Sequence, residues 1–371
     1  MTSVELRLTP PSYCHYADGR CDQTMPLASA LPETFFVYGS DPEPIAYTIE
    51  TAIEKLRQSS GQQRWRTWRD LPIPGQVIFC EICKGFRRSS TVVADVTTLN
   101  FNLLFEIGYS VGLGLPIIPI RDANYIRDKR LFDALGVLDT LGYLDFSNSE
   151  DIAGQLPKRL PAEPLPAPQG RFYKETPVYV LKGPVDTEGA VQLLSTLKKS
   201  RIRFRGYDQQ ETPRISLNEL RRQVDGSVGV VANLLPADRE GGIVHNALCA
   251  LACGYALAKE KVVLMLQEGA ASQAVDYRDL VQSYSNAGQV PGLLRPALER
   301  VLDFIQTGSF SPPEMKDLGI LRQLDLGDVA AENEIYGLHS YFVTTGQAIQ
   351  ALQWHARLVV CRKGSGKTAI F

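Results

Sequence analysis

The chain has 371 residues, which is more than one hydrophobic core usually organises and enough for two domains. Its composition, with 44% hydrophobic and 22% charged residues, is that of a soluble globular protein. A net charge of −2 gives no electrostatic reason to expect a nucleic acid or an anionic membrane as a partner. No segment has the roughly 20 consecutive apolar residues of a membrane span, and the N-terminus has no apolar run of signal-peptide length, so we expect a cytoplasmic protein.

Regular structure is expected to begin after an irregular, proline-rich segment, residues 1–30. Beyond it, short apolar runs alternate with segments in which apolar residues recur at helical spacing. In chain order the pattern predicts strands at 34–40, 64–70, 90–97 and 116–122, and helices at 42–58, 77–89 and 100–115. Largely apolar strands that alternate with helices are typical of a parallel sheet covered on both faces.

A second region repeats this order of elements after residues 157–170, a proline-rich stretch that we interpret as a linker. It predicts strands at 176–184, 201–208, 228–234 and 261–267, and helices at 187–200, 216–227 and 245–260. Three pairs of positions match in order: Gly39 with Gly183, Asp95 with Asn233, and Gly108 with Gly254. The sequence therefore predicts a duplicated α/β domain.

The predicted fold class is α/β, with two tandem flavodoxin-like or Rossmann-like domains that each contain a parallel sheet. The first domain is expected at 31–156 and the second, after the linker, at 171–307. Residues 308–371 are predicted to be a connector and the start of a third domain, because a helical pattern there leads to one apolar strand and a glycine-rich turn.

The cysteines number seven, an odd count that favours reduced thiols over a disulfide framework. Cys80 and Cys83 form a C-x-x-C pair, and Cys14 and Cys21 lie near His15. A zinc site joining these cysteines is one interpretation, although the spacings match no standard ribbon or finger. The favoured interpretation of the C-x-x-C pair is two small apolar side chains on a helix, so no metal is predicted.

Polar residues of the first domain gather where its strands end. Asp95 lies at the end of one buried strand, and Gly39, Ser40 and Asp41 lie at the end of another. Ligands of open parallel sheets bind at the carboxyl ends of the strands, and a glycine there lets a ligand approach the backbone. The sequence therefore predicts a ligand site at this edge. The alternative for Asp95 is a turn or capping role without a ligand.

The segment after this edge carries a motif, Asp–turn–Asn-x-x-x-Glu-x-Gly-Tyr, formed by Asp95, Asn102, Glu106, Gly108 and Tyr109. At these residues the chain resembles the nucleoside 2-deoxyribosyltransferase-like superfamily and the related TIR-type NAD glycohydrolases. The resemblance covers residues 34–122 as a fold pattern, and the motif is its specific part. Asn102 and Glu106 are four residues apart and share one face of a helix.

This resemblance implies cleavage or transfer at an N-glycosidic bond of a nucleoside, a nucleotide or NAD. Glu106 would be the nucleophile of a retaining reaction, and Asp95 a substrate or proton-transfer partner; the substrate-binding residues would be Gly39, Ser40, Asp41, Asn102 and Tyr109. A carboxylate beside the sugar stabilises the developing oxocarbenium ion, and no cofactor is required. The alternative interpretation of Glu106 is structural, because glutamate is a good helix former whether or not it contacts a ligand.

The second domain departs from the motif. Its equivalents of Asp95, Asn102 and Glu106 are Asn233, Leu248 and Ala252. With no carboxylate at either position, it is predicted to be a degenerate copy that serves dimerisation, binds a regulator or covers the cleft of the first domain. His245 and Asn246 are either a separate polar site or residues that cap a helix.

Residues 361–368 read Cys-Arg-Lys-Gly-Ser-Gly-Lys-Thr, which resembles the Walker A motif of P-loop ATPases with Cys361 in place of the first glycine. The candidate ATP-binding residues are Gly364, Ser365, Gly366, Lys367 and Thr368. Lys367 would reach the phosphates and Thr368 would bind Mg²⁺. The motif needs further strands and a Walker B aspartate, so ATP and Mg²⁺ are expected to bind here only in a longer protein.

The predicted function is therefore N-glycosidic chemistry by an effector module of a longer protein with a P-loop ATPase, an arrangement that resembles bacterial defence proteins. The alternative is a non-catalytic nucleotide sensor or an oligomerisation module that regulates the ATPase. A homo-oligomer is expected.

Overall fold

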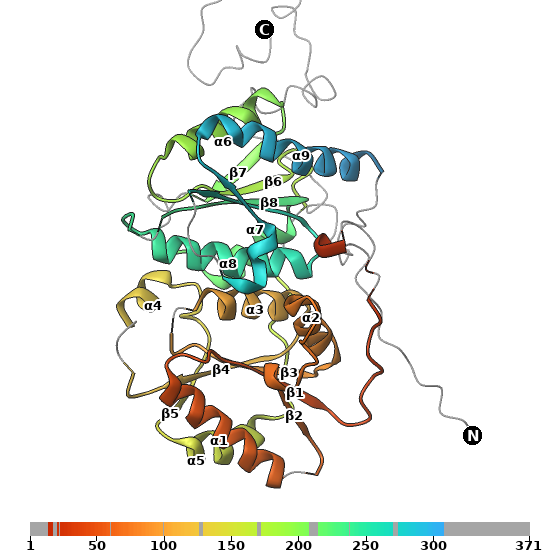
Figure 1. The fold of residues 1–371 in the computed structure, drawn as a ribbon, viewed down its shortest axis with the longest axis vertical. Coiled ribbons are helices and arrows are strands. Elements are labelled where there is room, and N and C mark those ends of the chain that lie inside the picture. Colours follow the sequence, from red (N-terminus) through yellow and green to blue (C-terminus); the bar gives the residue numbers. More distant parts are fainter. Residues whose placement is uncertain are drawn as a thin grey trace, which may run out of the picture. The chain divides into compact units, whose positions relative to one another are not determined.

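The structure is a computed structural model that describes residues 14–17, 21, 23–59, 61–98, 100–125, 129–168, 172–207, 214–236, 238–269 and 274–307 (Figure 1). The chain divides into two compact units, Met1–Ser311 and Pro312–Phe371, and all described residues belong to the first. The predicted P-loop, including Gly364, Ser365, Gly366, Lys367 and Thr368, lies outside the described residues.

The first half contains a parallel sheet with the strand order β2-β1-β3-β4-β5. Its strands are β1 (Glu33–Val37), β2 (Arg64–Thr67), β3 (Thr91–Asp95), β4 (Ile117–Asp122) and β5 (Leu144–Phe146). Its helices are α1 (Glu43–Ser59), α2 (Ile78–Arg88), α3 (Phe101–Gly112), α4 (Lys129–Leu135) and α5 (Ser149–Gln155), with short 3₁₀ turns η2 (Trp68–Asp70) and η3 (Leu156–Arg159). This is the flavodoxin-like order.

The second half contains a parallel sheet with the order β10-β9-β8-β6-β7. Its strands are β6 (Val178–Leu181), β7 (Phe204–Tyr207), β8 (Gly229–Leu234), β9 (Val262–Glu268) and β10 (Val281–Tyr284). Its helices are α6 (Glu188–Lys199), α7 (Leu217–Asp225), α8 (Gly242–Ala258) and α9 (Val290–Thr307), and its 3₁₀ turns are η4 (Val275–Leu280) and η5 (Ala287–Gln289). If the strands of each half are numbered from one in chain order, both sheets have the spatial order 2-1-3-4-5. The prediction of an α/β fold with two tandem flavodoxin-like domains is confirmed.

Each half also has elements that the sequence pattern did not predict, namely α4, β5 and α5 in the first and β10 and α9 in the second. Strands β5 and β10 are short and each contains exposed residues, so they lack the long apolar runs of the central strands. Within the described ranges, none of the helices combines the length and apolar character needed to cross a bilayer.

The strand β1 shows how the first sheet is covered on both faces. Phe35 and Val37 pack into a core cluster with α2 and α3, whereas Phe36 and Tyr38 pack into a second cluster with α1 and α5. The first of these clusters continues through α7 and α8 to β8, so one hydrophobic core joins the two halves. The outer face of the second sheet packs against α6 and α9.

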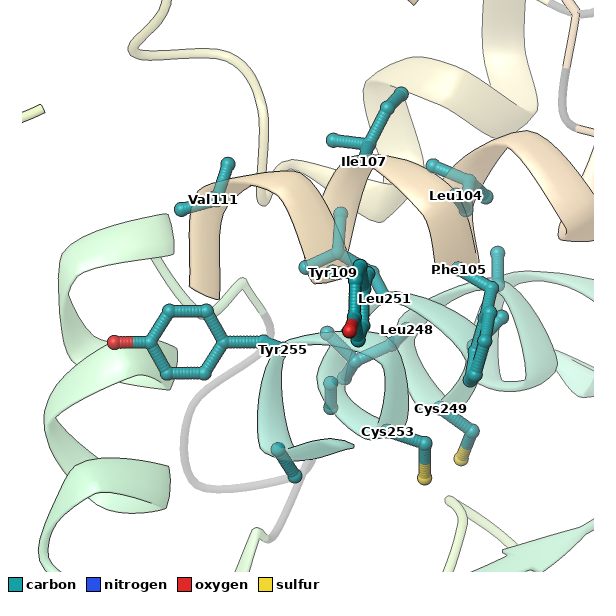
Figure 2. Close-up of a cluster of buried hydrophobic side chains, with 14 of the residues drawn as sticks. Leu104, Phe105, Ile107, Tyr109, Val111, Leu248, Cys249, Leu251, Cys253 and Tyr255 are labelled. Carbon is teal, nitrogen blue, oxygen red and sulfur yellow. The ribbon is translucent and has the colours of Figure 1, made fainter. Parts of the chain in front are cut away.

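Helices α3 and α8 form the centre of this shared core (Figure 2). The two helices pack closely because each has a glycine at the contact. A Cβ at Gly108 would lie 2.0 Å from the Leu251 carbonyl oxygen, and a Cβ at Gly254 would lie 2.0 Å from the Phe105 carbonyl oxygen. The offset of 146 residues that relates Gly108 to Gly254 also relates Phe105 to Leu251. The two copies therefore pack as a pseudo-symmetric pair within one chain, in the manner of an isologous dimer.

Candidate functional site

The carboxyl ends of β1 and β3 are neighbours, and the predicted edge residues lie on both. Ser40 and Asp41 are exposed just beyond β1, and Gly39 is half-buried. A Cβ at Gly39 would lie 3.2 Å from the Asn100 side-chain nitrogen, so this loop touches the start of α3. Asn100 begins that helix because its Oδ1 accepts hydrogen bonds from the backbone N–H groups of Asn102, at 2.9 Å, and Leu103, at 3.3 Å.

Asp95 lies at the same edge but beneath the surface, with 3% of its area exposed. Its Oδ1 accepts hydrogen bonds from the Thr97 backbone N–H, at 3.0 Å, and the Thr97 hydroxyl, at 2.5 Å. The Thr97 hydroxyl oxygen in turn accepts the backbone N–H of Asp122, which ties the end of β3 to the end of β4. Burial raises the pKa of Asp95 to about 6, against the effect of the Thr97 hydrogen bonds, and the negative charge of Asp122 adds to the rise.

Glu106 faces away from this edge, toward the second half of the chain. It is 8% exposed and forms a side-chain hydrogen bond with Asp276 of η4. Burial and the neighbouring Asp276 carboxylate hold the pKa of Glu106 well above its usual range. Two carboxyl groups can hydrogen-bond only if one carries a proton. Their interaction raises the pKa of Glu106 and lowers that of Asp276, which favours the proton on Glu106.

The turn η4 is fastened to α3 and to the N-terminal segment on either side of this pair. Asn102 Oδ1 accepts the backbone N–H of Asp276 at 3.1 Å, and the Tyr16 hydroxyl donates to the Asp276 carbonyl at 2.5 Å. The rings of Phe105 and Tyr277 are 5.2 Å apart between centroids. Asn102 and Glu106 therefore share a helical face, as predicted, and that face is covered by the second half.

Tyr109 lies in the core between α2 and α3. Its hydroxyl is 2.9 Å from Cys83 Sγ, and its ring packs against Phe79 and Phe86 with centroid distances of 5.0 Å and 5.9 Å. The structure thus brings the predicted residues into two groups. Gly39, Ser40, Asp41 and Asp95 form the edge group, whereas Asn102, Glu106 and Tyr109 belong to packed interfaces of α3.

Sequence reasoning missed Asp276, the residue that faces Glu106. It lies 170 positions further along the chain, in a segment with no recognisable motif, and its position depends on how the halves pack. Burial raises the pKa of Asp276, and the hydrogen bond from Glu106 opposes that rise.

The equivalent edge of the second sheet is filled by its own side chains. Gly183 follows β6 with a φ of 92°, and a Cβ there would lie 3.0 Å from Leu235 and 3.4 Å from His245. His245 is buried, and its Nε2 donates to the Asn233 carbonyl at 2.9 Å. Tyr284 donates a hydrogen bond to the Asn233 side chain at 3.3 Å. His245 is therefore a core residue that closes this edge.

Among the described residues, no group of three or more His, Cys, Asp or Glu side chains is placed to hold a metal ion. The zinc interpretation of the cysteines gains no support from that part of the chain.

No family model and no curated protein matches the chain. Among solved structures it is similar to the catalytic subunit of cobaltochelatase from Mycobacterium tuberculosis, with 16% identity over 64% of this chain and 21% of that chain and a TM-score of 0.22. The match spans about a fifth of the length of that protein, and a likeness at this score carries no argument about function.

Proposed function

We propose that the first half binds a nucleoside, a nucleotide or NAD at the carboxyl edge of β1 and β3, and that the chain is a nucleotide-responsive module. The observation that carries this proposal is the difference between the two sheets. At the first edge Ser40 and Asp41 are exposed beside Gly39, whereas at the second edge Leu235 and His245 fill the equivalent space.

The chemistry of the first edge suits such a ligand. In the flavodoxin-like order, the crevice between the first and third strands is the topological switch point, where ligands bind. The carboxylate of Asp41 and the hydroxyl of Ser40 are groups that accept and donate hydrogen bonds to ribose hydroxyls. Gly39 presents backbone without a side chain, so a sugar or phosphate can come close to it.

Cleavage of the N-glycosidic bond is the second candidate, favoured by the Asn102–Glu106 motif on the helix that begins at this edge. For Glu106 to attack a sugar, it would have to lose its proton, and η4 would have to leave the face of α3. A buried, protonated carboxyl group is a poor nucleophile. This geometry therefore supports binding better than turnover.

Calorimetric titration with NAD, ATP and deoxyadenosine would test binding. We expect at least one ligand to bind, and Ser40→Trp to weaken it by more than about tenfold, or about 1.4 kcal/mol. Ser59→Trp is the matched control, because Ser59 is also exposed but ends α1 away from the edge. Equal weakening by both variants, or no binding of any ligand, would remove the proposed site.

The same samples, followed by chromatography for released base, would separate the two candidates. Bound ligand that stays intact supports the sensor. Base release by the wild-type chain that is lost in Glu106→Gln, with binding retained, would establish cleavage instead. The partnership with a P-loop ATPase in a longer protein stays a prediction, as does the homo-oligomer.

A further inference from the structure

The N-terminal segment around Tyr16 is attached to both halves of the chain. Its 3₁₀ turn η1 (His15–Ala17) places the Tyr16 ring on Phe79 of α2, with a centroid distance of 5.3 Å. On the other side, the Tyr16 hydroxyl bonds the Asp276 carbonyl, and His15 Nε2 lies 2.8 Å from the Lys261 carbonyl oxygen. The segment therefore connects α2 of the first half to η4 and β9 of the second.

This arrangement gathers four thiols around one small cavity. Cys14 and Cys21 come from the N-terminal segment, and Cys80 and Cys83 come from α2; all four line a cavity of about 30 Å³. All four are reduced and half-buried rather than sealed in the core. A water molecule needs roughly 10–15 Å³, so the cavity has room for a molecule of about the size of hydrogen peroxide.

Cys14 and Cys80 line the same cavity from opposite elements, whereas Cys83 Sγ lies 2.9 Å from the Tyr109 hydroxyl. Burial raises the pKa of Cys80 to about 11, and among the neighbouring thiols Cys14 contributes most, ahead of Cys83 and Cys21. The stacking of Tyr16 on Phe79 brings the two segments together, because Cys14 is two residues from the first ring and Cys80 directly follows the second.

We propose that Cys14 and Cys80 form a reversible disulfide when the protein meets a peroxide, which locks the N-terminal segment onto α2. Because burial keeps Cys80 protonated, Cys14 attacks first: it gives up its proton, its thiolate attacks a peroxide oxygen, the O–O bond breaks, and the departing hydroxide takes the proton to form water, which leaves a sulfenic acid on Cys14. The Cys80 sulfur then attacks the sulfenic sulfur, the S–S bond forms, and the S–O bond breaks as the departing hydroxide takes the Cys80 proton to form the second water. Two thiols are oxidised, one hydrogen peroxide is reduced, and two waters form.

The disulfide would act on the region around Glu106. Cys14 is two residues from Tyr16, and Tyr16 donates to the carbonyl of Asp276, whose carboxylate pairs with Glu106. Locking the segment holds η4 over α3, and reduction releases that restraint. The modification site itself does not depend on what the carboxyl edge of the first sheet binds.

Peptide mass spectrometry of the full chain without reductant, after treatment with hydrogen peroxide, would test the proposal. We expect a Cys14–Cys80 cross-linked peptide, a fall of two titratable thiols per chain, and full reversal by dithiothreitol. Cys14→Ser and Cys80→Ser should each abolish the cross-link. Cys21→Ser, at the same cavity, and Cys253→Ser, buried in α8, should leave it in place.

The cross-linked peptide identified in the wild-type chain tests the proposal even if a variant fails to fold. A cross-link between Cys80 and Cys83, or oxidation of single thiols without a cross-link, would overturn the proposal. So would stoichiometric zinc in the purified protein that shields the four thiols from peroxide.

Discussion

Gly108 and Gly254 make the same contact from opposite sides of the α3–α8 interface. Each packs against the carbonyl oxygen of the residue three positions before the other glycine. Reciprocal contacts of this kind belong to isologous interfaces, in which one surface patch packs on a second copy of itself. Here both copies are in one chain. The glycine of the Glu-x-Gly-Tyr motif therefore serves helix packing in this protein.

Alanine at Gly108 is expected to destabilise the fold by about 1–3 kcal/mol, because the new methyl group would overlap a backbone oxygen and force the helices apart. Gly154→Ala in α5 is the matched control: a Cβ there meets nothing within 4 Å, so better helix propensity should stabilise the protein by up to about 1 kcal/mol. Urea unfolding of both variants measures the difference. Equal effects would show that the interface tolerates a wider spacing.

The Glu106–Asp276 pair should make stability fall as pH rises. A carboxyl group whose folded pKa is raised contributes its full stability below its unfolded pKa, here near 4.5, and loses it as pH increases toward the folded pKa. Glu106→Gln keeps a donor for Asp276 but does not titrate. We expect its free energy of unfolding to exceed that of the wild type increasingly as pH rises above the unfolded pKa of glutamate toward the raised folded pKa.

The control for this prediction is Glu299→Gln, which changes an exposed glutamate of α9. Chemical unfolding at several pH values should give parallel curves for Glu299→Gln and the wild type. A wild-type curve parallel to that of Glu106→Gln would show that Glu106 is ionised in the folded protein.

Asp95 should stabilise the fold as a hydrogen-bond acceptor for Thr97, and its ionisation should make stability depend on pH. Asp95→Ala leaves the buried Thr97 N–H without its acceptor and should cost about 1–3 kcal/mol, whereas Asp41→Ala at the exposed loop should cost little. Because the folded pKa of Asp95 is raised to about 6 from 3.8, wild-type stability is lost between about pH 4 and about pH 6 as pH rises. Asp95→Asn should remove that component in the same unfolding assay.

His245 should change stability in the opposite direction, with stability lost as pH falls. Burial lowers its pKa to about 4 from 6.5, so the folded state holds it neutral and stability is lost as pH falls through this range. The loss relative to His245→Gln, which can still donate to the Asn233 carbonyl, should approach about 3 kcal/mol at pH 4. Ring signals of His245 in NMR spectra provide a direct check: a chemical-shift midpoint near 6.5 would contradict a buried neutral ring.

The sequence by itself determined the order and class of the elements, because strand and helix periodicity are local properties. The helix that begins near Asn100 and the buried strand that ends at Asp95 could be predicted from neighbouring residues. The duplication was also visible, since both copies keep the order of strands, turns and helices. Short edge elements such as β5 were missed because three residues carry too little pattern.

The tertiary structure decided which residues meet across the chain. Asp276 faces Glu106 from the other half, and Cys14 of the N-terminal segment lines the same cavity as Cys80 of α2. Neither arrangement leaves a periodic trace in the sequence. The same packing left the first sheet edge accessible and filled the second with His245. Local sequence fixes which elements form, whereas long-range burial fixes the protonation and exposure of the groups on them.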